Sequence, residues 1–108
     1  MKIVIHQIVL TDAEIDQINA GKSVAKYTAK MNGMFGKFES DNAVFYSPTF
    51  AVEARDLEHA FEITNLWETP EAVETILEGG HSSSVGDLFQ VEDKFYMVDS
   101  FGFKEVTI

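Results

Sequence analysis

The side chains best suited to catalytic chemistry lie close together in the sequence, near the C-terminal end of the chain. They are His81, Ser83, Asp87 and Asp99. A histidine can take a serine proton while a carboxylate orients the imidazole, which is the chemistry of a hydrolytic triad. Nothing in their spacing requires these residues to converge, and the strand–turn–helix context of a nucleophile elbow is absent. Turn capping by the Ser82 and Ser84 hydroxyls is therefore favoured over catalysis.

Metal and cofactor chemistry has little support in the sequence. The chain contains no cysteine, which excludes a disulfide framework, a thiolate zinc site and a cysteine nucleophile. No glycine-rich turn carries the lysine of a phosphate-binding loop. His6 ends an apolar run, and we expect its ring to satisfy a hydrogen bond rather than to bind a ligand. We expect no metal, no cofactor and no enzymatic activity.

The charge balance limits the classes of partner. The net charge is −10, from 18 acidic and 8 basic residues, which argues against direct contact with nucleic acid. The only basic cluster, Lys22, Lys26 and Lys30, repeats every four residues and would lie on one helix face. It could hold a phosphate or an acidic partner, but a solvated face is the simpler interpretation.

The excess acidity is concentrated in one segment. Between Glu53 and Glu78 there are eight acids and a single base, Arg55. Carboxylates spaced along a helix can imitate a row of phosphates and attract a basic groove, although a solvated face is the simpler alternative. The predicted partner-binding residues are Glu58, Glu62, Trp67, Glu68, Glu71, Glu74 and Glu78. Trp67, Tyr46 and Phe50 are the candidate aromatic anchors, if they are exposed.

Four short helices are predicted. Thr11 and Glu14 form a capping box before a helix over residues 12–20. Ser23 can cap a second helix from residue 24 to about 31, which Asn32-Gly33 and Gly36 would end. Asp56 opens a third helix over 57–64. Thr69-Pro70-Glu71 is a typical helix start and predicts a fourth over 70–78.

Three regions show strand patterns. Residues 2–10 are apolar on both faces, which is typical of a central strand. Residues 37–53 predict a hairpin with its turn at Asp41-Asn42, and Pro48 indicates an edge strand or a bulge. Residues 86–107 predict a β-meander. The fold class is therefore α+β, with a mixed or antiparallel sheet of five or six strands and helices over one face.

The whole chain, residues 1–108, is predicted to be a single domain, since its length suits one domain and its apolar content can fill one core. The predicted core includes Ile3, Ile5, Ile15, Ile18, Phe45, Phe61, Val73, Leu77, Leu88, Phe95, Met97 and Phe103. The first ten residues are too short to span a bilayer and lack a signal-peptide cleavage site. We therefore expect a soluble protein of the cytoplasm.

Two stretches near the C-terminus carry a family resemblance. The run from Gly80 to Leu88 and the run from Phe95 to Phe103 resemble the signature of YodL-like domains, and Phe61-Glu62-Ile63-Thr64-Asn65 resembles their upstream helix. The resemblance covers about residues 57–106. It implies a small α+β domain and an origin on a phage, a plasmid or another mobile element, so the cytoplasm would be that of a host cell. It implies no specific activity.

Three functions from different classes follow. The first is a protein that binds and inhibits or redirects a host macromolecule, such as a nucleic-acid-handling or defence protein, through an acidic surface that mimics nucleic acid. The second is an accessory module that forms a homodimer through an edge strand or the lysine-bearing helix. The third is a small hydrolase that uses His81. We favour the first, with a basic host protein as partner and without direct nucleic-acid or membrane contact.

Overall fold

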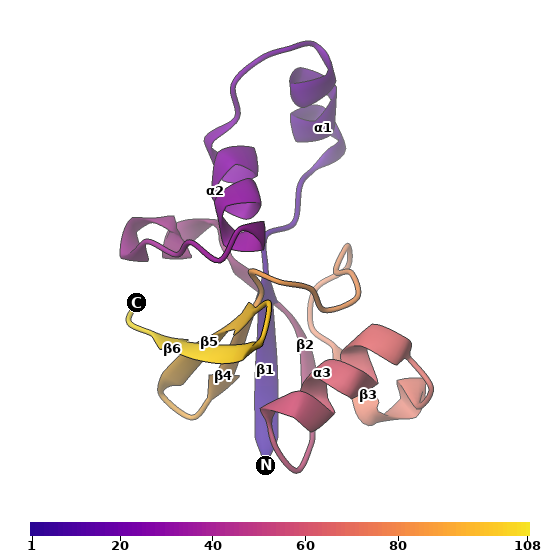
Figure 1. Cartoon of the computed structure of the whole chain (residues 1–108). Helices are drawn as coiled ribbons and strands as arrows, with labels where there is room; N and C mark the ends of the chain where they lie inside the picture. The colour runs from indigo at the N-terminus through magenta and orange to yellow at the C-terminus, as the bar shows by residue number, and fades with distance from the viewer.

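A six-stranded antiparallel sheet forms the centre of the protein. The computed structural model describes residues 1–108, and its strands lie in the order β3-β2-β1-β4-β5-β6 (Figure 1). The strands are β1 (Lys2–Gln7), β2 (Ser47–Glu53), β3 (Val73–Thr75), β4 (Leu88–Val91), β5 (Lys94–Asp99) and β6 (Gly102–Val106). The predicted α+β class, the central position of β1 and the C-terminal meander β4-β5-β6 are confirmed.

The helices are α1 (Asp12–Asn19), α2 (Ala25–Met34) and α3 (Leu57–Leu66), with two 3-10 segments, η1 (Ser40–Phe45) and η2 (Pro70–Ala72). The capping box of α1 is present: the Thr11 hydroxyl accepts from the Glu14 backbone N–H at 3.1 Å, and the Glu14 carboxylate accepts from the Thr11 N–H at 2.8 Å. α2 runs through Asn32-Gly33, which were expected to end it, and it has no side-chain cap from Ser23. No helix is both long and apolar enough to cross a membrane.

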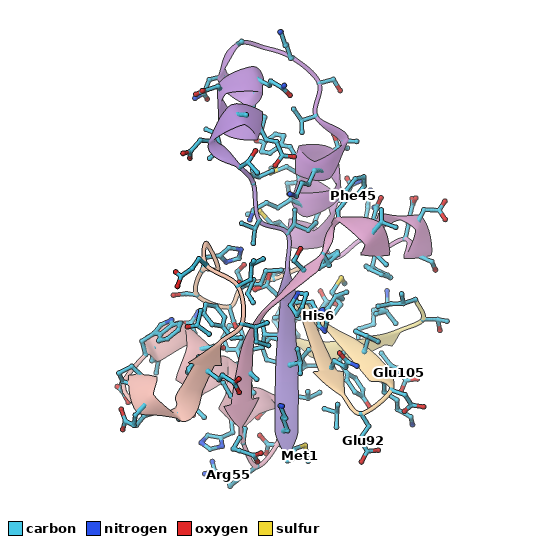
Figure 2. The ribbon with its side chains drawn as sticks, turned by 180° about the vertical axis from the view of Figure 1, so that it is seen from behind. Met1, His6, Phe45, Arg55, Glu92 and Glu105 are labelled. Carbon is cyan, nitrogen blue, oxygen red and sulfur yellow. The ribbon has the colours of Figure 1, made fainter.

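The prediction that all helices cover one face of the sheet is wrong. Figure 1 shows α3 packed beside the sheet, whereas α1 and α2 lie beyond the Gln7 end of β1. The molecule is consequently elongated, 42 × 27 × 22 Å. Figure 2 shows the opposite face of the sheet, with His6 on β1 and no helix over the strands. His6 donates a hydrogen bond to the Gln90 side chain at 2.8 Å, as expected of a satisfied strand histidine.

The main core lies between α3 and the sheet. Strand pairing places Ile5 beside both Phe50 and Phe89, and Ala60 and Ile63 of α3 complete the buried cluster. The predicted core residues Ile3, Ile5, Leu88 and Met97 are buried, and Ile18, Phe45, Phe61, Val73, Phe95 and Phe103 are partly buried. Ile15 and Leu77 are exposed, contrary to prediction, because α1 and the segment after β3 pack too loosely to cover them.

The hairpin predicted over residues 37–53 is wrong in its first half. Asp41-Asn42 lie inside η1 rather than in a turn between strands. Both edges of β2 are already paired, one with β1 and the other with β3, so no edge is free for a strand before it. Pro48 does mark a bulge, as predicted: the register with β1 shifts between Ile5 and His6, opposite Pro48.

The helix predicted over residues 70–78 is also wrong. After the single turn of η2 the chain forms β3, which pairs with Phe50–Val52 of β2. A nine-residue helix is marginal without tertiary contacts, and the β-branched Val73 and Thr75 favour a strand. The edge of β2 that β1 leaves unpaired offers the backbone partners that decide between these two conformations.

Candidate functional site

The six glutamates of the predicted partner-binding set are all exposed. Glu58 and Glu62 lie on α3, and the other four lie after it: Glu68 in the loop, Glu71 in η2, Glu74 on β3 and Glu78 before Gly79. None of them makes an ion pair or a side-chain hydrogen bond, since the only ion pairs are Met1–Glu53 and Lys26–Glu14. Because residues 70–78 do not form an α-helix, the glutamates are spread over α3, a loop, η2 and an edge strand rather than forming a row on two helix faces. Val73 packs against the core, so its neighbour Glu74 points to the face of the sheet opposite α3.

The aromatic anchors predicted for this surface are corrected by the structure. Trp67 caps α3 in a left-handed conformation, φ 55°, and its half-buried ring packs edge-on against Phe50 at 5.3 Å. Phe50 itself is buried in the core. The Tyr46 hydroxyl donates to the Gly86 carbonyl at 2.6 Å, which holds that ring against the main chain. All three rings therefore stabilise the fold, and Phe50 is unavailable to a partner.

The three lysines of α2 and the residues before it do not form one exposed row. Lys26 pairs with Glu14 at 3.2 Å. Lys30 points inward, where its ammonium donates to the Ile8 carbonyl at 3.1 Å and contacts His81 Nε2 at 3.2 Å. Of the three, only Lys22 is exposed without a partner. The three ammonium groups are therefore not arranged to bind a phosphate together.

The hydrolytic set does not assemble as a triad. The Ser83 hydroxyl is buried and shares a hydrogen bond with the Thr64 hydroxyl at 2.5 Å, while the Ser83 carbonyl accepts from the Asn65 amide at 2.7 Å. The His81 ring instead contacts Lys30 and the Ser82 carbonyl, the latter through Nδ1 at 2.9 Å. Ser83 thus ties the loop to α3, and no serine hydroxyl is bonded to the imidazole.

A buried polar cluster at the Gln7 end of β1 holds the loop from His81 to Asp87. The Gln7 amide nitrogen donates to the Asp87 carboxylate at 2.9 Å and to the His81 carbonyl at 2.8 Å. The Gln7 carbonyl oxygen accepts from the Thr49 hydroxyl at 2.8 Å and from the His81 N–H at 3.1 Å. Asp87 also accepts from the Ser84 N–H at 3.0 Å. One glutamine therefore joins β1, β2 and the loop.

Burial shifts the acidity of this cluster. Burial raises the pKa of Asp87 to about 6, against the opposing effects of the Gln7 hydrogen bond and the nearby His81 and Lys30. Burial lowers the pKa of Lys30, which the charge of Asp87 partly offsets. Burial also raises the pKa of Tyr46 to about 12. Shifts of this kind occur at catalytic sites and in structural networks alike, so access to the cluster decides between the two.

Access to the cluster is very limited. The pocket beside Lys30, Tyr46 and Asp87 has a volume of about 10 Å³, which is about the space of one water molecule. No set of three histidine, aspartate or glutamate side chains is placed to hold a metal ion. The cluster therefore has the geometry of a structural anchor for the loop.

Sequence reasoning missed the members of this cluster that come from outside the loop: Gln7, Lys30, Tyr46 and Thr49. A signal for Gln7 is present, because a glutamine continues the face that begins with Ile3 and Ile5. A polar side chain on a buried strand face requires buried partners. Nothing local to Lys30 or Thr49 distinguishes them from solvent-facing residues.

Comparison with known proteins adds no relative. No family model, no curated protein and no solved structure matches this chain.

Proposed function

We propose that this protein binds another macromolecule, a protein with a basic surface, through the glutamate band defined by Glu58, Glu62, Glu68, Glu71, Glu74 and Glu78. The observation that carries the proposal is that all six carboxylates are exposed and unpaired, whereas the segment contains only one base, Arg55. Fixed carboxylates without internal partners produce a negative potential that accelerates and orients encounter with a basic surface.

The elements below the band suit this role. α3 is fixed by Ala60, Ile63 and Thr64, which are buried against the sheet, and β3 is fixed by its pairing with β2. The carboxylates are therefore carried by backbone that does not need to be ordered on binding, which lowers the entropic cost of association. The resemblance to YodL-like domains supports a mobile-element origin, so we propose a host protein of the nucleic-acid-handling or defence class as the partner.

A capture experiment tests this proposal. The tagged protein is incubated with host lysate at low salt and compared with two charge-matched variants. The first variant neutralises the band with Glu62→Gln, Glu68→Gln, Glu71→Gln and Glu74→Gln. The second neutralises four exposed acids elsewhere, with Asp12→Asn, Asp16→Asn, Asp41→Asn and Asp93→Asn.

A basic protein that is retained by the wild type and by the second variant, released as salt is raised, and lost by the first variant supports the proposal. Equal retention by both variants, or equal loss by both, contradicts it. In either case the band would contribute no more to the contact than other exposed acids.

Self-association is a second candidate function, and one observation favours it. β6 pairs only with β5, so its other edge has free backbone groups that could pair with a second copy. Light scattering tests this candidate: a monomer at high micromolar concentration would exclude it. The alternative route through the lysine-bearing helix is not proposed, because Lys26 and Lys30 are engaged within the monomer.

A further inference from the structure

An apolar groove lies between α3 and the β5–β6 hairpin. Its volume is about 290 Å³, and Phe61, Val85, Val98 and Phe103 form its apolar lining. Phe61 and Phe103 pack against the buried core below, and Phe103 also contacts Phe89 at a ring distance of 5.5 Å. The lining is therefore held by the same packing that stabilises the fold, and the groove is present before any partner binds.

Acidic groups surround this groove. Glu58 from α3 and Asp99 from the end of β5 line it. The Asp99 carboxylate accepts from the Ser100 N–H and lies beside Gly36, just after α2. Strand register places Glu105 on the sheet face that carries Phe103, whereas Glu62, one turn along α3 from Glu58, lines a separate pocket with Glu68. No lysine or arginine lines the groove. An apolar site with carboxylates at its rim complements an apolar side chain that has a basic neighbour.

The tip of the hairpin adds a further apolar group. Phe101 is fully exposed, at 103 % of its reference area. The next residue, Gly102, has φ 121° and belongs to the groove, in a backbone conformation that favours glycine. A phenylalanine that makes no contact within its own chain gains apolar burial only when a partner covers it.

We infer that this groove receives a peptide segment of the partner that presents a leucine or aromatic side chain next to lysine or arginine. The inference rests on the proposed function and specifies how part of the glutamate band is used, since Glu58 lines the groove. A volume of about 290 Å³ lies at the lower end of small-molecule sites, roughly 300–1,000 Å³, and suits one or two large side chains. A phosphate-bearing ligand would be repelled by Glu58 and Asp99.

The test uses a fluorescein-labelled nine-residue peptide, Gly-Ser-Arg-Lys-Leu-Arg-Lys-Ser-Gly, as the probe. Two control peptides replace either the leucine by serine or the four basic residues by glutamine. Fluorescence anisotropy gives the relative affinities, and amide chemical shifts of the isotope-labelled protein give the location. We expect each control peptide to bind at least about tenfold more weakly, with shifts at Val85, along Val98–Phe103 and on α3.

Three variants complete the test. Phe101→Ser removes the exposed ring, and Glu58→Gln with Asp99→Asn removes both rim charges while keeping the acceptor that Asp99 offers to the Ser100 N–H. Val44→Ser removes another exposed apolar side chain, 81 % exposed, on η1 and far along the chain from the groove. The first two are expected to weaken leucine-peptide binding at least about fivefold to tenfold, and Val44→Ser to leave it unchanged.

Equal binding of the leucine and serine peptides, or shifts that lie outside the groove, would overturn the inference. Lysate capture separates this failure from that of the proposed function. If the four-glutamine variant of the band loses the lysate partner while Phe101→Ser keeps it, the groove inference fails and the proposed function stands. If the leucine peptide binds the groove but neutralising the band leaves capture unchanged, the proposed function fails.

Discussion

Gln7 is the residue on which the buried polar cluster depends. Its side chain makes hydrogen bonds to Thr49, His81 and Asp87, and it is fully buried. Truncation would leave the Asp87 carboxylate with one donor fewer and the His81 N–H without an acceptor. Buried groups that lose their partners cost more than the hydrogen bond itself contributed.

We therefore predict that Gln7→Ala lowers the free energy of unfolding by about 3 kcal/mol or more. Gln90→Ala is the matched control, because Gln90 is half-buried and its side chain bonds only His6 and the Glu92 carbonyl. That change should cost about 1 kcal/mol. Urea unfolding of both variants measures the difference, and equal losses would show that the cluster does not stabilise the fold.

Asp87 predicts a pH dependence of stability. Its folded-state pKa is raised by burial from an ordinary value of 3.8 to about 6, so the folded protein binds a proton more tightly than the unfolded chain. The stability that protonation provides is fully present below the unfolded pKa and is lost as pH rises through about 6. Lowering the pH from about 7 to about 4.5 should therefore raise the free energy of unfolding by about 2 kcal/mol through this group.

Asp87→Asn isolates this contribution. The asparagine oxygen can still accept from Gln7 and the Ser84 N–H, but the side chain no longer titrates. Urea unfolding of both proteins at the two pH values gives a double difference in which the other acids cancel. If the wild type and Asp87→Asn show the same change with pH, a group other than Asp87 carries the dependence.

At the scale of elements, two glycines set how closely α2 approaches the loop before β4. A Cβ on Gly86 would lie 2.6 Å from the Gly33 carbonyl carbon, and one on Gly33 would lie 3.2 Å from the Gly86 Cα. Gly86 also has φ 97°, which disfavours other residues. The Tyr46 hydroxyl bonds the Gly86 carbonyl at the same place, so this contact joins α2, the loop and the residue before β2.

Gly86→Ala should therefore destabilise the protein by at least about 2 kcal/mol more than Gly21→Ala. Both glycines have positive φ, 97° and 81°, but a Cβ on Gly21 meets nothing within 4 Å. Both substitutions thus carry the cost of the left-handed conformation, about 1–2 kcal/mol, and only Gly86 adds a clash. Thermal unfolding of the two variants separates these costs. Similar melting temperatures would mean that α2 moves away without penalty.

Elements with a local determinant were predicted correctly from the sequence. The capping box of α1, the Asp56 cap of α3, which accepts from the His59 N–H at 2.8 Å, and the meander all depend on neighbouring residues. The helix predicted at 70–78 failed because the edge of β2 that β1 leaves unpaired competes for its backbone. That edge, Phe50–Val52, lies 21 to 25 positions before its partners in β3. Sequence patterns report local preference, and here a long-range partner overrode it.

The candidate site likewise has features that the sequence predicts and features that only the folded chain reveals. The exposure of the six glutamates follows from their charge and could be predicted. The groove could not, because Phe61, Val85 and Phe103 come from three separate elements and meet only in the folded chain. Gln7 and Asp87 are 80 residues apart, and only the pairing of β1 with β4 brings their backbones together.

At the scale of the whole molecule, the buried polar cluster and the proposed binding surface lie in different places. The buried cluster around Gln7 lies where β1 meets α2 and the loop, at one end of the sheet. The six glutamates lie on α3 and along the segment from α3 to Gly79, and the groove lies between α3 and the β5–β6 hairpin. Substitutions in the band should therefore alter binding without unfolding the protein, and substitutions in the cluster should do the reverse, which makes the two roles experimentally separable.

The net charge predicts a salt-dependent stability. With a net charge of −10 and only two ion pairs, folding brings together carboxylates that repel one another. Raising the salt from about 10 mM to about 0.5 M shortens the screening length several-fold and should raise the free energy of unfolding by about 1 kcal/mol.

The variant with Glu62, Glu68, Glu71 and Glu74 changed to glutamine provides the internal comparison. It should be more stable than the wild type at low salt and should gain less from added salt, because it removes four of the chain's 18 acidic charges from one exposed segment. Urea midpoints at both salt concentrations measure this. An equal salt response in the two proteins would mean that salt acts on apolar burial instead, and the band would then carry no measurable repulsion in the folded state.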